Sequence, residues 1–173
     1  MRIGIITGAM KPVHIAHWKL IEMASIENDE VRLFVSGTDR VKKNEFPILG
    51  STMRAVWNKH LIQHLPKNVI IEIIDQSPVV RAYEFLGKMN EEGSLSVFTV
   101  YSSPEDFQKR FPIYAQTKYF GNLYKNCQIQ QRAGTDPLRA TEMRTLLSEN
   151  RKQEFIKKLP SVADGEAIWQ LLT

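Results

Sequence analysis

The stretch RIGIIT (2–7), continued by TGAMKPVHIAH (7–17), decides the fold class of this chain. RIGIIT is nearly all apolar and does not alternate, which is typical of a strand buried on both faces of a sheet. Gly8 can adopt backbone angles that other residues avoid, and Pro12 suits the approach to a helix. A helix is then predicted over about residues 13–28. A buried strand that turns at once into a helix is the first half of a βαβ unit.

The same alternation continues along the chain. Four further strands are predicted at VRLFVS (31–36), VIIEII (69–74), LSVFTVYS (95–102) and CQIQQR (127–132). Helices are predicted over about 52–65 and 79–90, a short helix opens at Pro104, and two or three short helices follow over about 142–172. This spacing indicates right-handed βαβ units. We therefore predict an α/β fold: a Rossmann-like parallel five-stranded sheet with helices on both faces and short C-terminal helices.

Length and composition narrow the class of protein. The 173 residues contain no low-complexity segment or linker, which fits a single domain over residues 1–173. The single cysteine, Cys127, excludes an intrachain disulfide and a cysteine zinc site. The longest uncharged stretch has 12 residues (93–104), against the ~20 that a membrane helix needs. The interrupted apolar run at residues 1–10 argues against a signal peptide. We expect a cytoplasmic protein without a membrane partner; collagen, coiled-coil and secreted mini-protein classes are excluded.

The charge is unevenly placed, although the net charge is only +4. Residues 107–144 hold seven Lys and Arg against two acidic residues. Such a block is typical of an anion site or a nucleic-acid surface. A solvated basic face would give the same pattern.

Two histidines, His14 and His17, follow the first predicted strand and lie three residues apart in the first helical turn. The start of a helix also offers free backbone N–H groups and the positive end of the helix dipole. Together they make a site for phosphate oxygens. A metal site would need a third ligand, and two incidental surface histidines are the remaining alternative. The patterns G-x-G-x-x-G and G-x-x-x-x-G-K-[ST] are absent, so neither a standard dinucleotide site nor a P-loop is expected.

Two further predicted helix starts carry an arginine where a capping box has Glu or Gln. In RATEMR (139–144) we expect Thr141 as the N-cap and Arg144 at the third helical position; GSTMR (50–54) repeats this with Ser51 and Arg54. A positive charge there is unfavourable unless an anion lies over it. The alternative is an arginine that simply reaches solvent.

HIAH (14–17) after TGAMKP, with RATEMR near the C-terminus, resembles the HxGH and ISxTxxR signatures of the nucleotidyltransferase superfamily. Within it, the layout is most similar to the compact archaeal-type nicotinamide mononucleotide adenylyltransferases and to phage cytidylyltransferase-like proteins. EFPILGSTMR (45–54) resembles an NPFTxGER-like segment, and residues 154–172 are similar to their closing helices. The resemblance implies that a nucleotidyl group moves from a nucleoside triphosphate to a phosphorylated acceptor, and that pyrophosphate leaves.

The resemblance also implies roles for residues that match the motifs. His14, His17 and Arg144 would be catalytic, with His17 on the α-phosphate; Thr141 and Arg144 would bind the β- and γ-phosphates. Gly8, Ala9 and Lys11 would contact the nucleotide, and Arg54 would hold the acceptor's phosphate or the triphosphate. A dissociable Mg²⁺ would come with the triphosphate, and no protein-held metal is implied.

Several positions depart from the family pattern. Ala16 replaces the glycine of HxGH, Lys11 stands where many members have Asp or Gln, and Arg139-Ala140 replaces Ile-Ser. The segment DQSPVVRAYEF (75–85) lacks the tryptophan that nicotinamide enzymes place near the pyridine ring. We expect Tyr83 to stack there and Arg81 to bind a phosphate. Lys42 and Lys43 would face phosphates or solvent.

The first hypothesis is adenylyl transfer from ATP to nicotinamide mononucleotide, a step of NAD biosynthesis. No general base is expected, because the attacking phosphate is already ionised. One alternative is a cytidylyltransferase-like enzyme acting on a small phosphorylated alcohol. Another is a non-catalytic nucleotide- or RNA-binding module, which the basic block favours. For the enzyme we expect no nucleic-acid partner, and the sequence leaves a homo-oligomer open.

Overall fold

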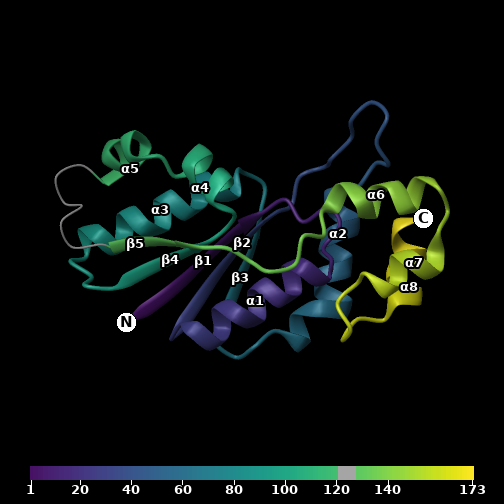
Figure 1. The fold of residues 1–173 in the computed structure, drawn as a ribbon, viewed down its shortest axis with the longest axis horizontal. Helices are drawn as coiled ribbons and strands as arrows, with labels where there is room; N and C mark the ends of the chain where they lie inside the picture. The colour runs from purple at the N-terminus through teal and green to yellow at the C-terminus, as the bar shows by residue number, and fades with distance from the viewer. Residues whose placement is uncertain (121–127) are drawn as a thin grey trace.

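Five parallel strands form the sheet at the centre of the structure, a computed structural model that describes residues 1–120 and 128–173. They are β1 (Arg2–Gly8), β2 (Glu30–Ser36), β3 (Val69–Ile74), β4 (Val97–Tyr101) and β5 (Gln128–Arg132). Their spatial order is β3-β2-β1-β4-β5, and every neighbouring pair is parallel (Figure 1). The predicted Rossmann-like α/β fold is confirmed. Cys127, predicted as the first residue of the fifth strand, lies outside the described residues.

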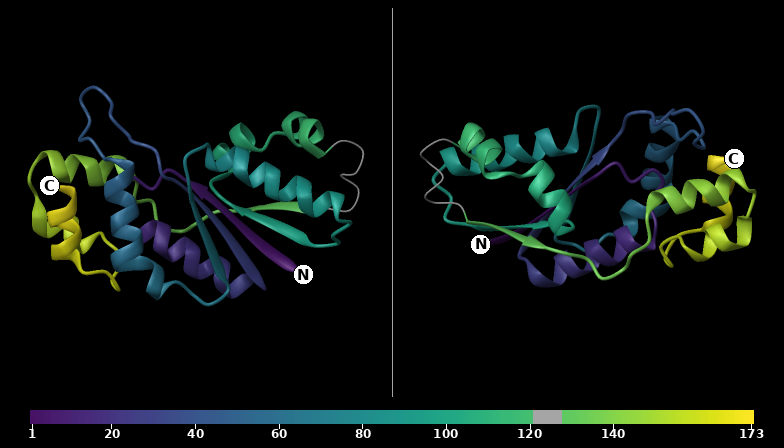
Figure 2. Two further views of the ribbon diagram at one scale, coloured as in Figure 1. Left: turned by 180° about the vertical axis from the view of Figure 1, so that it is seen from behind. Right: turned by 45° about the horizontal axis from the view of Figure 1, so that its top comes forward.

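Helices cover both faces of this sheet (Figure 2). On one face lies α1 (Ile15–Glu27), and on the other lie α3 (Pro78–Glu91), α4 (Pro104–Arg110) and α5 (Ile113–Phe120). Beyond the carboxyl ends of the strands, α6 (Ala140–Ser148), α7 (Lys152–Lys157) and α8 (Gly165–Leu172) gather beside α2 (Gly50–Val56), and their apolar side chains join the core on the α1 side (Figure 1). Along β1, Ile6 is buried in the core on the α1 side of the sheet, whereas Ile3 and Ile5 are buried in the core on the α3 side. The strands are apolar along their whole length because both faces are covered.

The C-terminal end of α1 is tied to β4. Asn28, the C-cap of α1, donates from Nδ2 to the carbonyl of Ala24 (2.9 Å) and to the hydroxyl of Tyr101 (2.8 Å). The Tyr101 hydroxyl in turn donates to Glu27 Oε2 at 2.7 Å. These side chains pass over Gly4 of β1, where an added Cβ would lie 3.0 Å from Asn28 and 3.2 Å from Tyr101. The helix and the strand are therefore fixed relative to each other.

The strand order reverses at β1, because the chain goes from β1 to β2 on one side and reaches β4 on the other. In open parallel sheets, ligands bind at this point, beyond the carboxyl ends of the strands. Here α1 begins after β1 and α4 begins after β4, so two helix starts lie at the reversal.

Three predicted details of the helices were wrong. The helix predicted over 52–65 is divided into α2, a π-helical turn η1 (Trp57–Leu61) and a 3₁₀ turn η2 (Ile62–His64). A second helix, α5, follows the short one that opens at Pro104.

The third concerns the predicted N-caps, Thr141 and Ser51, because the N-cap positions are Arg139 for α6 and Leu49 for α2, and neither makes a side-chain cap bond. The first N–H of α2 donates instead to Asp39 (2.7 Å), and the Thr141 hydroxyl accepts from Nη2 of Arg144 one turn later in the same helix (3.2 Å). Among the described residues no helix is both long and apolar enough to span a membrane.

Candidate active site

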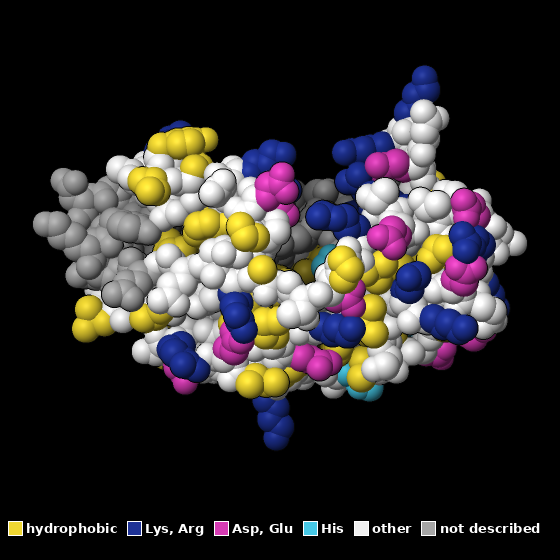
Figure 3. Space-filling model, viewed as in Figure 1, with side chains coloured by type: hydrophobic (Ala, Val, Ile, Leu, Met, Phe, Trp, Pro, Cys, Tyr) yellow, Lys and Arg dark blue, Asp and Glu magenta, His cyan; other side chains and the backbone are white. Residues whose placement is uncertain are grey.

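A cleft of about 530 Å³ opens beyond the carboxyl ends of β1, β2 and β4, and a second hollow of about 300 Å³ adjoins it. The two share His17, Ser102, Ser103, Asp106, Arg139 and Ala140, among other residues. Figure 3 shows the hollow near the middle of one face, with a histidine inside and Lys and Arg side chains around it. We call both parts together the cleft. It lies where the strand order reverses, as the sheet topology requires.

His14 and His17 form a reciprocal cap at the start of α1. His14 is the N-cap residue, and its Nδ1 accepts from the Ala16 N–H (3.2 Å). The His14 N–H donates to Nδ1 of His17 at 3.2 Å. Their rings stack with centroids 3.7 Å apart. The sequence predicted two histidines in the first turn; the structure shows that they take the roles that Ser or Thr and Glu or Gln have in a capping box.

This cap fixes the protonation of both rings. Because each Nδ1 accepts a backbone N–H, the proton of each neutral ring is on Nε2. Burial lowers the pKa of His14 from 6.5 to about 4. Burial, and then the charge of His14, lowers the pKa of His17 well below its usual value. His14 is 2% exposed, and its Nε2 has no hydrogen-bond partner among the described residues. Each ring thus has one N–H donor that the helix does not use.

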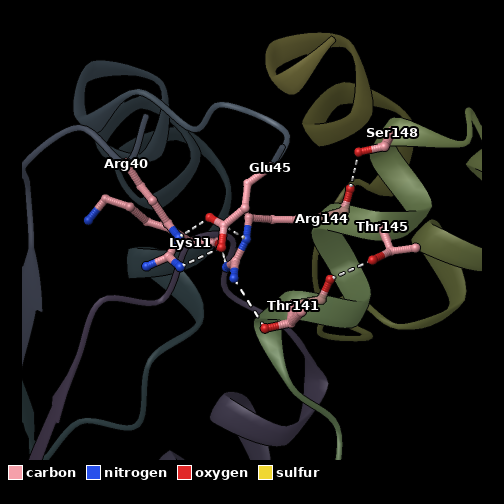
Figure 4. Close-up of polar contacts among 7 residues, drawn as sticks. All are labelled: Lys11, Arg40, Glu45, Thr141, Arg144, Thr145 and Ser148. Carbon is pink, nitrogen blue, oxygen red and sulfur yellow. Dashed lines mark hydrogen bonds and ion pairs between the residues drawn. The ribbon is translucent and has the colours of Figure 1, made fainter. Parts of the chain in front are cut away.

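The facing wall of the cleft carries Arg144 of α6 (Figure 4). Arg144 is buried; its Nη1 donates to the carbonyl of Lys11 (2.8 Å) and its Nη2 to the hydroxyl of Thr141 (3.2 Å). The bond to Lys11 connects α6 to the turn that precedes α1, and the bond to Thr141 lies within α6. The two signature segments at opposite ends of the sequence therefore meet at one cleft.

Lys11 lies between the ends of β1 and β2 and is 2% exposed. Its Nζ donates to the carbonyl of Ser36 (2.9 Å) and, at 3.4 Å, to that of Ala9. Burial, and then the nearby charge of Arg40, lowers the pKa of Lys11 from 10.5 to about 8. An ammonium bound to two carbonyls in a cleft keeps a third N–H for a ligand.

The residues predicted to hold the nucleotide come together here. Gly8, Ala9, Lys11, His14, His17, Thr141 and Arg144 all line the cleft.

The basic residues predicted to hold the acceptor do not line the cleft. Arg54 donates to Asp75 (2.8 Å) and to the carbonyl of Ile73, so it connects α2 to the end of β3. Arg81 pairs with Glu72 of β3 at 3.1 Å and lies over the ring of Phe34. Lys42 and Lys43 are exposed in the loop between β2 and α2.

Tyr83 is 3% exposed and lies behind the wall of the cleft. Its ring contacts Phe111 (centroids 5.1 Å apart) and Tyr119 (4.5 Å), and its hydroxyl donates to the carbonyl of Arg110 (2.9 Å). Arg110 and Phe111 line the cleft, whereas Tyr83 does not. Tyr83 therefore supports the wall, and its ring does not face the cleft for stacking.

The structure adds cleft residues that the sequence did not single out, chiefly Arg40, Asp106 and Arg110. Arg40 follows the end of β2 and precedes Lys42 and Lys43 in the sequence. Its position just after a strand end was the signal that could have identified it. Asp106 and Arg110 lie in the short helix after β4, where the sequence predicts a helix but gives no motif.

No family model and no curated protein match the sequence. Solved structures with a similar fold include Thermotoga maritima TmcAL bound with alpha-thio ATP (14% identity, TM-score 0.54, 99% of this chain and 54% of that chain). They also include NadR protein in complex with NR (17% identity, TM-score 0.54, 93% of this chain and 44% of that chain). A third is Plasmodium falciparum nicotinic acid mononucleotide adenylyltransferase complexed with NaAD (12% identity, TM-score 0.51, 99% of this chain and 94% of that chain). The chain spans about half the length of the first two, and at these identities the likeness shows a shared fold.

Proposed function

We propose that this protein is a nucleotidyltransferase that moves a nucleotidyl group from a nucleoside triphosphate to a phosphorylated small molecule. The observation that carries the proposal is the reciprocal cap of His14 and His17. It fixes two Nε2–H donors at a helix start in the cleft, and Arg144 stands on the facing wall. N–H donors at a helix start, with cations opposite, suit a polyphosphate. The fold shared with proteins solved with alpha-thio ATP and NaAD supports the proposal.

In this proposal the nucleotide lies along the start of α1. His14 and His17 hold the triphosphate, with His17 on the α-phosphate, and Thr141 and Arg144 bind the β- and γ-phosphates. Gly8, Ala9 and Lys11 contact the nucleotide from the end of β1.

The chemical step needs alignment and charge stabilisation more than proton transfer. An oxygen of the acceptor phosphate forms a bond to the α-phosphorus. The bond from that phosphorus to the oxygen that bridges to the β-phosphate breaks, and pyrophosphate leaves with the electron pair. The acceptor phosphate is already ionised and needs no base. The Nε2–H donors and Arg144 stabilise the charge that builds up on the phosphoryl oxygens.

We propose that Mg²⁺ enters as part of the triphosphate substrate. The donors of the cleft are mainly imidazole, ammonium and guanidinium N–H groups, which bind phosphate and do not suit a magnesium ion held by the protein. Among the described residues no three His, Cys, Asp or Glu side chains come together as a metal site.

For the substrates, ATP with nicotinamide mononucleotide is the first pair to test, as the resemblance implies. A second candidate is CTP with a small phosphorylated alcohol. It is favoured by the burial of Tyr83 and Phe111, which are 3% and 2% exposed, because neither ring is open to stack on a pyridine. In either case we propose Arg110 for the acceptor's phosphate, in place of Arg54, Arg81, Lys42 and Lys43, whereas Arg40 joins Lys11 and Arg144 on the triphosphate.

The test is pyrophosphate release with Mg²⁺ across four nucleoside triphosphates and a series of phosphorylated acceptors. Turnover with one pair identifies both substrates. The control is His17→Ala, which removes the Nε2–H donor and leaves no side-chain N–H in its place. Triphosphate binding without turnover for any pair would contradict the enzyme assignment and favour a non-catalytic nucleotide-binding module.

A further inference from the structure

A hairpin, residues 40–48, stands out from the body of the protein between β2 and α2 (Figure 1). At its base the N–H of Arg40 donates to the carbonyl of Ile48 (2.8 Å), and the N–H of Ile48 donates back (3.0 Å). Ile48 is 1% exposed. The tip, residues 41–44, is exposed, and Val41 is 66% exposed. The base of the hairpin is therefore fixed in the core, and the tip is not.

Glu45 connects this hairpin to the cleft. Its carboxylate accepts from Nε (2.8 Å) and Nη2 (3.0 Å) of Arg40, and its Oε2 lies 3.5 Å from Nε of Arg144 (Figure 4). The Nε of Arg144 is buried and makes no hydrogen bond within the described residues. Two parallel bonds from one guanidinium are also how arginine binds phosphate. Glu45 thus occupies the side of Arg40 and of Arg144 that a phosphate would use.

We propose that Glu45 is an internal competitor for the anion site, and that a bound polyphosphate displaces it and releases the tip of the hairpin. This inference rests on the proposed function, which assigns a polyphosphate to this cleft. Lys11, Arg40 and Arg144 put three positive charges together, and Glu45 neutralises one of them. A ligand with a single negative charge offers these arginines no more than Glu45 does. A polyphosphate carries several charges and replaces it, so Glu45 selects ligands by charge.

The opposite role would be to position the two arginines for the ligand. The two roles predict opposite effects of removing the carboxylate. If Glu45 competes, anions bind more tightly without it. If Glu45 positions Arg40 and Arg144, anions bind more weakly without it.

The experiment is calorimetric titration of the full chain with inorganic tripolyphosphate, comparing the wild type with Glu45→Gln. We expect Glu45→Gln to bind tripolyphosphate about tenfold more tightly, since one competing charge-assisted pair is gone. The matched control is Glu154→Gln. Glu154 also binds one arginine, Arg151, with both oxygens but lies outside the cleft, so its removal should leave the Kd unchanged.

A second measurement follows the tip directly. Trypsin cleaves after lysine, and Lys42 and Lys43 lie in the exposed tip. Tripolyphosphate should speed cleavage there in the wild type, which is the reverse of the usual protection by a ligand. In Glu45→Gln, cleavage should be fast from the start and should not change with ligand.

The outcomes separate the two proposals. If the wild type binds tripolyphosphate and Glu45→Gln binds it no more tightly, the competitor role is wrong and the proposed function stands. If neither protein binds tripolyphosphate, the competitor role and the proposed function are both wrong.

Discussion

The two walls of the cleft offer phosphate groups opposite kinds of donor. On the α1 side, His14 and His17 are neutral, and each is held by a backbone N–H of the helix start. On the facing side, Arg144 and Arg40 carry permanent charge and share the carboxylate of Glu45. A neutral donor satisfied by its own helix needs no counter-ion, whereas a buried charge is costly without one.

The two walls are therefore prepared for a ligand in different ways. The imidazoles are set by the fold and keep their geometry with or without a ligand. The arginines must exchange one partner for another. Four substitutions test this contrast and are given in order of decreasing effect.

Removing the Nε2–H donor of His17 should have the largest effect. We expect His17→Ala to lower kcat about 10²- to 10³-fold with little change in KM for the triphosphate, since the lost contact strengthens in the transition state. The readout is steady-state pyrophosphate release on the substrate pair that the wild type uses. His64→Ala makes the same chemical change at an exposed site outside the cleft and should have no effect. A kcat for His17→Ala within twofold of the wild type would show that His17 does not take part in catalysis.

The neutrality of the histidine wall can be tested through stability. His14 has a pKa of about 4 in the folded state and about 6.5 when unfolded. Between these values the unfolded chain binds more protons, so the stability from this group is complete above pH 6.5. It is lost as the pH falls toward 4, by up to roughly 3 kcal/mol.

His14→Asn keeps a good N-cap residue and removes this titration. Urea unfolding at pH 7.0, 5.5 and 4.5 should therefore show a smaller loss of stability for His14→Asn than for the wild type. Equal losses in the two proteins would mean that His14 titrates normally in the folded protein.

A substitution at Tyr83 tests whether this residue supports the wall of the cleft from behind or contacts the ligand. Tyr83→Phe removes the hydroxyl that donates to Arg110 and keeps the ring that packs on Phe111. We expect a loss of about 1 kcal/mol in the free energy of unfolding and no change in KM for the acceptor. Urea unfolding measures the free energy of unfolding, and steady-state rates over a range of acceptor concentrations give the KM. A several-fold change in acceptor KM with unchanged stability would restore Tyr83 to the binding site.

The smallest expected effect is the pH dependence of anion binding through Lys11, which lies on the same side of the cleft as Arg40 and Arg144. With a pKa of about 8, its ammonium loses its proton as the pH rises through 8. Tripolyphosphate binding should weaken about fourfold between pH 7 and pH 8.5 in the wild type, in proportion to the charged fraction. Lys11→Arg keeps its charge over this range, so the ratio of the two Kd values at each pH removes the ligand's own titration. A constant ratio would show that Lys11 does not contact the anion.

Much of the architecture could be predicted from local sequence. RIGIIT, VRLFVS and VIIEII are continuous apolar runs because both sheet faces are covered, and that pattern is visible without tertiary information. The pairing of HIAH with RATEMR likewise indicated that residues 14–17 and 139–144 meet. Their meeting through the Arg144 bond to the Lys11 carbonyl was not predictable, since it depends on a contact across 133 positions.

Other features depend on side chains that local rules do not bring together. The first N–H of α2 is satisfied by Asp39, 11 residues earlier, so the local capping rule placed the start of α2 wrongly. In α6 the Thr141 hydroxyl accepts from Arg144 of the same helix, and the N-cap position is Arg139. As an aromatic residue, Tyr83 is able to stack on a ligand, which is what the sequence indicates. Its burial depends on how α3, α4 and α5 pack together, and local sequence does not show this packing. Glu45 opens EFPILGSTMR, but the resemblance of that segment implies no role for it, and the proposed role follows only from where the hairpin returns to Arg40.

The tie between α1 and β4 has a consequence for how sequences of this fold can diverge. Asn28 and Tyr101 fill the space that a side chain at position 4 would need. A larger residue at position 4 therefore requires smaller or differently placed residues at positions 28 and 101 at the same time. We expect these three positions to vary together in a set of aligned relatives, as one evolutionary unit that keeps the end of α1 on the sheet.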